Sequence, residues 1–165
     1  YGKGSTFTLE LPAPSAEISA GDGEKEHRSN DLPALCAHAL LVEDNAVNLK
    51  VMEALLRQLG ITFESADSGS KGLEMLAVHS SRFDIILTDL ELEDMSGFEF
   101  IRGIPPGQHV VAVSAYPEAE MANRCRAAGF AEYIEKPVRL QSLGSLLHRL
   151  LVREKSQGLP GPRFP

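Results

Sequence analysis

The chain is poor in cysteine, in long apolar runs and in positive charge. Its 165 residues include two cysteines, Cys36 and Cys125, which are too few for a disulfide framework or a four-ligand zinc site. A reducing, cytoplasmic setting is therefore the default expectation. Cys125 falls within a predicted helix, where we expect it to serve in packing.

Charge and hydropathy exclude two further classes of protein. The formal net charge is −7 at pH 7, whereas a nucleic-acid-binding domain presents a basic patch. No apolar run approaches the roughly 18–20 residues needed to cross a bilayer. No signal peptide is present, and the chain begins at Tyr1 rather than at Met. We therefore interpret the chain as a piece of a longer protein that contacts neither nucleic acid nor membrane directly.

Composition divides the chain into zones. Residues 1–11 have alternating apolar positions that predict a strand. Residues 12–37 are rich in Pro, Ala, Ser and Gly with almost no large apolar side chains, which predicts a flexible linker. Residues 38–153 follow a regular pattern, and residues 154–165 are expected to form a disordered tail.

The regular zone alternates short apolar strands with helical stretches, five times over. Three runs, at 39–42, 85–87 and 110–113, are continuously apolar, as is typical of parallel strands covered by helices on both faces. Further strands are predicted at 62–66 and 133–135. Five such units are expected to wind with right-handed crossovers in the order 2-1-3-4-5. The predicted fold is α/β, a doubly wound five-stranded parallel sheet flanked by five helices.

The helices are predicted from apolar spacing and from their ends. The first, from 46 to 59, places four apolar residues on one face at four-residue spacing: Val47, Val51, Leu55 and Leu59. The third is short, because the pair Pro105-Pro106 cannot continue it. The fourth begins near Pro117 and stops at Gly129.

Polar side chains follow four of the predicted strands, at the point where each strand ends. They are Glu43 and Asp44 after the first strand, Asp89 at the end of the third, Ser114 after the fourth and Lys136 after the fifth. The carboxyl ends of parallel strands share one rim, where ligands bind in sheets of this type. The sequence therefore predicts three carboxylates, one hydroxyl and one ammonium around a single pocket.

Three carboxylates at one rim repel each other, by about 4 kcal/mol per pair at a separation of about 4 Å and an effective dielectric of about 20. Such a cluster persists where a divalent cation neutralises it, and all-oxygen ligation with room for water and phosphate suits Mg²⁺. Taken singly, these groups have plainer interpretations: a helix-capping acidic pair, a solvated lysine and a turn hydroxyl. Together they are the parts needed to transfer a phosphoryl group onto a carboxylate.

At these residues the chain resembles response-regulator receiver domains, which have a flavodoxin-like fold. The resemblance covers residues 38–153 and is carried by five landmarks in the family's order: Leu41–Asn45, Leu87–Leu90, Met95–Glu99, Val113–Ala115 and Glu135–Pro137. It implies four ligands to Mg²⁺: Glu43, Asp44, Asp89 and the backbone carbonyl of Glu91.

The same resemblance implies the remaining roles. Asp89 would be the phosphoacceptor, and Ser114 and Lys136 would contact the phosphoryl group. Tyr133 matches the aromatic residue whose rotamer follows phosphorylation, so that Ser114 and Tyr133 would form the switch. Glu93 stands where the family usually has proline; it would add negative charge beside the pocket and loosen the loop.

Residues 1–11 resemble the end of a histidine-kinase ATP-binding domain, with the Gly-x-Gly-Ser-Thr-Phe run as its last glycine-rich turn and strand. This implies a hybrid sensor kinase, anchored in the inner membrane, with a cytoplasmic receiver at or near its C-terminus. None of the histidines lies in a phosphoacceptor context, so the fragment itself is not expected to be a kinase. The implied partners are the phosphohistidine of a kinase dimerisation domain and a histidine phosphotransfer protein.

Three hypotheses follow. The leading one is a phosphorelay receiver that accepts a phosphoryl group on Asp89 and passes it to a histidine phosphotransfer partner. The second is a receiver that acts as a docking or autoinhibitory module without being phosphorylated, but a module of that kind would tolerate loss of the acidic pair, Asp89 and Lys136. The third is a small metal-dependent phosphatase with Asp89 as nucleophile and Glu91 as acid/base, although the chain lacks a cap domain for substrate selection.

Overall fold

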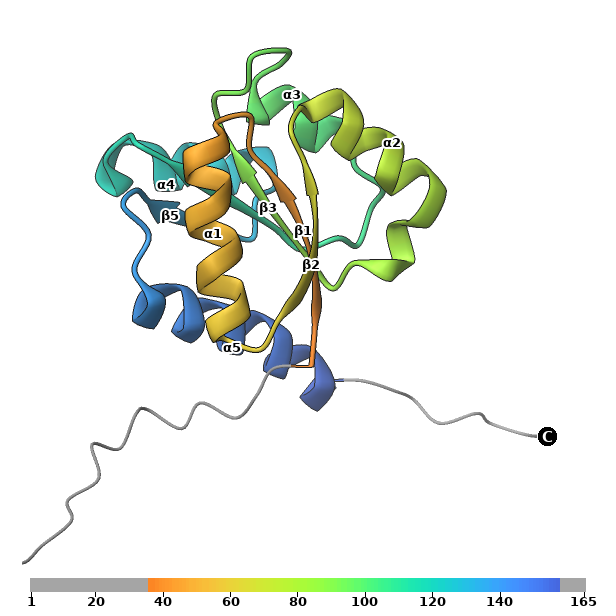
Figure 1. Cartoon of the computed structure of the whole chain (residues 1–165), viewed down its shortest axis with the longest axis vertical. Coiled ribbons are helices and arrows are strands. Elements are labelled where there is room, and N and C mark those ends of the chain that lie inside the picture. Colours follow the sequence, from red (N-terminus) through yellow and green to blue (C-terminus); the bar gives the residue numbers. More distant parts are fainter. Residues whose placement is uncertain (1–35, 158–165) are drawn as a thin grey trace, which may run out of the picture. The chain divides into compact units, whose positions relative to one another are not determined.

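Five parallel strands form the centre of the molecule, in the order β2-β1-β3-β4-β5. The computed structural model describes residues 36–157. Its strands are β1 His38–Val42, β2 Thr62–Ala66, β3 Ile85–Asp89, β4 Val110–Ser114 and β5 Glu132–Glu135. Every pairing within the sheet is parallel, so the predicted fold class, strand order and strand direction are confirmed (Figure 1).

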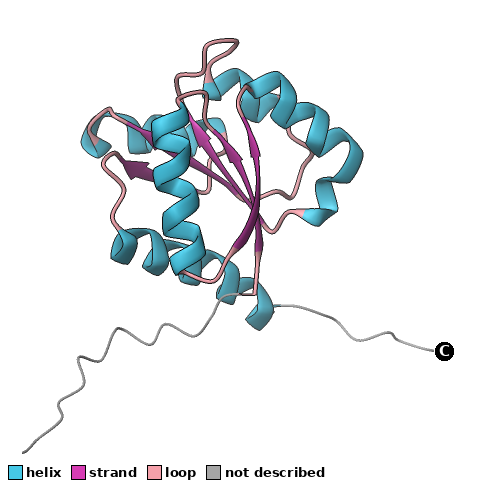
Figure 2. Cartoon of the chain, in the orientation of Figure 1, coloured by secondary structure: helices cyan, strands magenta, loops and turns pink. Residues whose placement is uncertain are grey.

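Helices cover both faces of this sheet (Figure 2). They are α1 Ala46–Gln58, α2 Gly69–His79, α3 Gly97–Arg102, α4 Glu118–Ala128 and α5 Leu140–Gln157, with a 3₁₀ turn, η1, at Ser80–Arg82. Side chains of α1 and α5 pack into one core with one face of the sheet, and those of α2, α3 and α4 pack into a second core with the other face. The architecture is therefore three layers, helix, sheet and helix.

Continuous apolar strands are needed because an apolar core lies on each face of the sheet. Successive residues of a strand point to opposite faces, so Ala39 and Leu41 of β1 enter the core with α1 and α5, while Leu40 and Val42 enter the other. Every residue of β3 and β4 is buried. The edge strand β2 is largely part-exposed and correspondingly less apolar. This arrangement places the strand ends at a fixed position between two packed layers.

The first helix does not bury the face predicted for it. Val47 and Val51 are 72% and 49% exposed, whereas Met52 and Leu56 lie in the core. Steps of four residues overshoot a helical turn by about 40°, so four residues at that spacing spiral around the helix instead of forming one stripe. Of the four residues predicted for this face, Leu55 and Leu59 pack against the core.

Other local predictions hold or extend further than expected. The fourth helix ends as predicted at Gly129, whose φ of 104° suits glycine. At the start of α1, Asn45 acts as the cap and accepts hydrogen bonds from the backbone N–H groups of the first turn. Cys125 of α4 is buried in the core between the sheet and helices α2, α3 and α4, so its predicted packing role is confirmed. The helix α5 continues to Gln157, beyond the predicted receiver end at residue 153.

Some predictions fall outside the part of the chain that the structure describes. These are the strand and kinase resemblance of residues 1–11, most of the linker at 12–37, and the tail from residue 158 onward. Within residues 36–157, no helix has both the length and the apolar character needed to cross a bilayer.

Candidate functional site

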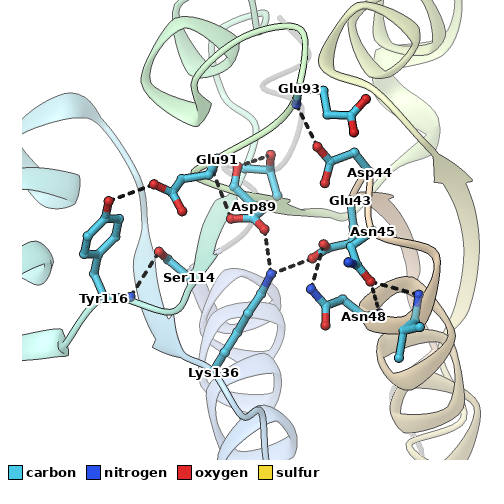
Figure 3. A network of polar contacts seen from close by, with 12 residues as sticks. Glu43, Asp44, Asn45, Asn48, Asp89, Glu91, Glu93, Ser114, Tyr116 and Lys136 are labelled. Carbon is cyan, nitrogen blue, oxygen red and sulfur yellow. Dashed lines mark hydrogen bonds and ion pairs between the residues drawn. The ribbon is translucent and has the colours of Figure 1, made fainter.

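The five predicted rim residues meet at the carboxyl edge of the sheet. Parallel register aligns the strand ends, pairing Val42 with Thr88, Asp89 with Val113 and Ser114 with Glu135. The loops that follow β1, β3, β4 and β5 therefore start at one level. Figure 3 shows their polar side chains gathered around Asp89 and Lys136.

Lys136 ties the first and third strands together across this edge. Its Nζ donates hydrogen bonds to Glu43 Oε2 at 2.7 Å and to Asp89 Oδ2 at 2.6 Å. Burial alone would lower the pKa of Lys136, but the hydrogen bonds and negative charges of Asp89 and Glu43 outweigh it and raise the pKa. The ammonium therefore stays charged at neutral pH and stabilises negative charge on Asp89.

The three carboxylates form a tight acidic cluster. Ligand oxygens of Glu43, Asp44 and Asp89 lie within 4.8 Å of one another, and Glu43 and Asp89 are 5% and 9% exposed. Among the described residues, one ammonium, that of Lys136, forms ion pairs with this cluster. Oxygen donors, close spacing and surplus negative charge fit a hard divalent cation.

Backbone and side-chain donors fix the orientation of each carboxylate. Asn48 Nδ2 donates to Glu43 Oε1 at 3.0 Å, and the backbone N–H of Glu91 donates to Asp89 Oδ1 at 3.0 Å. The latter bond places the Glu91 backbone beside the cluster, while its carbonyl as a metal ligand stays a prediction. Asn48 was missed at the sequence level, although it lies in the first turn of α1, five positions after Glu43.

The predicted switch pair converges on a residue that sequence reasoning missed, Tyr116. The backbone N–H of Tyr116 donates to the Oγ of the fully buried Ser114 at 3.4 Å, and the Tyr133 hydroxyl donates to the carbonyl of Tyr116. Burial raises the pKa of Tyr133. The two predicted switch residues are thus linked through the start of the β4–α4 loop.

Tyr116 also bridges two loops over the site. Its hydroxyl donates to Glu91 Oε1 at 2.7 Å, which joins the β4–α4 loop to the β3–α3 loop (Figure 3). The hydrogen bond and charge of Glu91 raise the pKa of Tyr116. An aromatic residue two positions after a rim serine was the available signal, but its partner could not be inferred without the loop conformation.

The β3–α3 loop is tied to its neighbours through Glu93 and Asp94. The backbone N–H of Glu93 donates to Asp44 Oδ2 at 2.7 Å. Both carboxylate oxygens of Asp94 accept hydrogen bonds from the start of α2, from Gly69 and Ser70. This pattern runs against the expectation that Glu93 loosens the loop, because Glu93 and Asp94 each make a hydrogen bond to a neighbouring segment.

Family comparison agrees with this geometry. The family model of the response regulator receiver domain matches residues 39–148. The chain belongs to the response regulator receiver domain family.

Two curated relatives and two solved structures show the same likeness. The chain is 31% identical over 157 residues to the aerobic respiration control sensor protein ArcB of Escherichia coli (strain K12), covering 90% of this chain and 19% of that protein. It is 34% identical over 130 residues to the signal transduction histidine-protein kinase BarA of the same strain, covering 76% of this chain and 14% of that protein. The predicted resemblance to receivers of hybrid sensor kinases is therefore confirmed.

The solved structures support the fold. A response regulator receiver domain protein from Clostridium thermocellum matches with a TM-score of 0.68 at 25% identity, covering 74% of this chain and 99% of that one. The receiver domain of Ssk1, co-crystallised with the histidine phosphotransfer signaling protein Ypd1 of Saccharomyces cerevisiae, matches with a TM-score of 0.64 at 23% identity, covering 76% of this chain and 93% of that one.

Proposed function

We propose that this chain is the phosphoacceptor receiver of a hybrid sensor histidine kinase in a two-component phosphorelay. An Asp89 carboxylate oxygen attacks the phosphorus of a phosphohistidine; the O–P bond forms, and the P–N bond breaks with its electron pair left on the imidazole. A histidine nitrogen of a phosphotransfer partner then attacks the phosphorus of this acyl phosphate; the P–N bond forms, and the O–P bond breaks to regenerate the Asp89 carboxylate. The observation that carries this proposal is the buried Asp89, held between Lys136 and two further carboxylates.

The residues around Asp89 have different roles in this transfer. Glu43, Asp44, Asp89 and the Glu91 carbonyl would hold Mg²⁺, which when bound would supply positive charge to the transferring phosphoryl oxygens. Lys136 supplies a second, fixed positive charge as a point donor. Its present bonds to Asp89 and Glu43 support this role, because the same ammonium can follow the negative charge from carboxylate to phosphoryl oxygen.

Ser114 and Tyr133 carry the proposed switch. A phosphoryl group on Asp89 draws the Ser114 hydroxyl toward its oxygens, and the contacts that both residues make with Tyr116 transmit the shift. Moving such an equilibrium from 1:99 to 99:1 requires about 5.5 kcal/mol of differential stabilisation. The buried positions of Ser114 and Tyr133 support this role, because neither side chain can shift without moving its neighbours.

The partner must approach the rim closely enough to present its histidine. Val47 and Val51 of α1 are large, apolar and exposed beside the acidic pair, and they suit contact with an apolar helix face of such a partner. The Ssk1 receiver, which has the same fold, was crystallised with a histidine phosphotransfer protein. The parent of this chain is proposed to be an inner-membrane sensor kinase with the receiver on the cytoplasmic side.

The test uses beryllofluoride, a phosphoryl mimic, with Mg²⁺ and the isotope-labelled 165-residue chain. Amide signals of Asp89, Ser114 and Lys136 are expected to shift together, and the Asp89→Asn variant is expected to show no such shift. Unperturbed amides in the wild-type chain would overturn the phosphoacceptor role. Phosphotransfer to a histidine phosphotransfer protein from chain carrying labelled phosphoryl tests the relay direction. A regulatory effect that survives Asp89→Asn would favour the unphosphorylated docking module.

A further inference from the structure

The β3–α3 loop is anchored on α2 through Asp94. Its Oδ1 accepts from the backbone N–H of Gly69 at 2.9 Å, and its Oδ2 accepts from the N–H and the Oγ of Ser70 at 2.8 and 2.7 Å. These donors lie in the first turn of α2, where backbone N–H groups lack helical partners and a negative charge is favoured. The hydrogen bonds, with that of the Ser70 backbone foremost, hold the pKa of Asp94 below its ordinary value.

Close packing accompanies these hydrogen bonds. A Cβ atom at Gly69 would lie 2.6 Å from Cγ and Sδ of Met95 and 3.2 Å from Leu92 Cδ1. The loop therefore lies against the helix start at a distance that only glycine permits without displacement. Asp94 and Met95 are consecutive, so a polar contact and an apolar contact fix the same short segment.

Fixing Asp94 fixes the peptide before it, and this peptide contacts a predicted metal ligand. The N–H of Glu93 donates to Asp44 Oδ2 at 2.7 Å. The neighbouring predicted ligand, Glu43, is held through its backbone. Its N–H donates to the carbonyl of Ala66 at 3.1 Å, and Ala66 is the last residue of β2, shortly before α2 begins. Both members of the acidic pair are thus tied to the junction between β2 and α2 or to the loop anchored on it.

We infer that Asp94 is a positioning residue for the metal centre. Held by the start of α2, it fixes the Glu93 N–H, which in turn holds one oxygen of Asp44 and leaves the other for the cation. This inference rests on the magnesium site of the proposed function. It is specific to chains without proline at position 93, because proline has no N–H to donate.

The geometry favours an orienting bond over a competing one. Asp44 contributes an oxygen to the cluster, within 4.8 Å of those of Glu43 and Asp89, while it accepts the hydrogen bond from Glu93. A donor that turned the carboxylate out of the cluster would compete with the metal, but Asp44 stays in the cluster while it accepts this hydrogen bond. Groups that orient ligands from behind in this way change metal affinity by about 10- to 100-fold when removed.

The first experiment separates the N–H of residue 93 from its charge. Glu93→Pro removes both, and Glu93→Ala removes the charge alone. Mg²⁺ affinity of the 165-residue chain, measured by calorimetry and by amide shifts, is expected to fall about 10-fold in Glu93→Pro relative to Glu93→Ala. Equal affinities in the two variants would refute the orienting role of the N–H.

The second experiment moves the anchor. Asp94→Ala is expected to weaken Mg²⁺ binding about 10-fold, and Asp94→Asn less, because the amide oxygen can still accept the hydrogen bonds made to one of the two carboxylate oxygens. Asp67→Asn is the matched control. Asp67 lies just before α2, and its side chain is 69% exposed and pairs with Lys71. The substitution therefore removes one negative charge near α2 without changing a residue of the β3–α3 loop. It is expected to leave Mg²⁺ affinity near that of the wild type.

Thermal unfolding without Mg²⁺ distinguishes positioning from a purely structural role. An Asp94→Ala chain with a lowered Tm and unchanged Mg²⁺ affinity would contradict the inference. Broadening of amide signals by Mn²⁺ near Asp44 and Asp89 verifies that the metal occupies this cluster in each variant. A wild-type chain that binds no metal there would overturn the magnesium site and this inference together, whereas normal wild-type binding with unaffected variants would overturn the inference alone.

Discussion

Glu53 of α1 is buried, as are two of the three carboxylates of the rim cluster, Glu43 and Asp89, yet the charges at these two places are balanced in different ways. Glu53, 7% exposed, accepts hydrogen bonds from Lys50 at 3.1 Å, from Arg57 at 3.2 Å and from Ser65 at 3.3 Å. One carboxylate there has two cations. At the rim, the cluster of three carboxylates has one ammonium among the described residues, that of Lys136, which pairs with Glu43 and Asp89.

The difference separates a structural ion pair from a functional site. The network of Glu53 is complete within the chain: the hydrogen bonds and charges of Lys50 and Arg57 outweigh the burial of the carboxyl and lower its pKa. The rim keeps surplus negative charge, which a folded chain tolerates at a cost in self-repulsion. Under the proposed function, a cation from solution balances this surplus charge, and the following variants test whether the two sites differ in this way.

The largest expected effect is the loss of phosphorylation in Asp89→Asn. The amide is no nucleophile toward phosphorus, so incorporation of labelled phosphoryl from a phosphorylated histidine partner is expected to vanish. Glu53→Gln, which neutralises the other buried carboxylate, is expected to be phosphorylated at nearly the wild-type rate. Equal loss in both variants would mean that the two acidic groups differ less than their geometry indicates.

Lys136→Met is expected to cost about 2 kcal/mol of unfolding free energy in the absence of Mg²⁺. Removing one partner of a fully buried ion pair costs about 3–5 kcal/mol, and the 18% exposure of the Lys136 side chain reduces this figure. Added Mg²⁺ is expected to restore part of the loss, since it replaces the missing positive charge. Urea unfolding with and without Mg²⁺ measures both quantities, and a variant insensitive to Mg²⁺ would argue against a cation site.

Glu53→Gln is expected to cost about 1 kcal/mol, with no recovery in Mg²⁺, because its charge-assisted bonds weaken without creating an uncompensated anion. Its pH dependence has a definite sign. The folded pKa of Glu53 is lowered, so its stabilisation is present above the ordinary glutamate value of about 4.3 and is lost as pH falls through the folded pKa. Urea midpoints across this acid range are expected to fall less steeply in the variant than in the wild type.

The smallest expected effect is a change in the pKa of Tyr116, whose hydroxyl donates a hydrogen bond to Glu91. Glu91 raises the pKa of this phenol, so Glu91→Gln is expected to lower it toward the ordinary tyrosine value. Titration of tyrosinate absorbance at alkaline pH measures the shift, with Tyr116→Phe identifying the signal. An unchanged pKa would mean that the hydrogen bond between Tyr116 and Glu91 does not persist in solution.

Strand order and the rim could be predicted from sequence because few physical rules determine them. A continuously apolar run such as 85–87 must be covered on both faces, and the polar residue that closes this strand, Asp89, must lie at the strand end. These rules need only the local sequence and the parallel arrangement. From these rules alone, five residues are predicted at one edge of the sheet: Glu43, Asp44, Asp89, Ser114 and Lys136.

The remaining features depend on loop conformation and on helix rotation. The exposed position of Val47 followed from how α1 rotates on the sheet, which spacing alone did not determine. The contacts of Tyr116 with Glu91 and of Asp94 with the start of α2 join loops far apart in sequence. No local pattern encodes such contacts, because their partners are set by the path of each loop between fixed strand ends.

The bond between Lys136 and Glu43 spans 93 positions of the chain. The site therefore does not exist in any folding intermediate that lacks β5, however well its earlier strands have paired, and contacts of such long range form slowly. Nascent or truncated molecules that end before residue 136 would carry the acceptor carboxylate without its ammonium. Under the proposed function, the capacity to accept a phosphoryl group would therefore depend on the docking of the last strand, which brings Lys136 to Glu43 and Asp89.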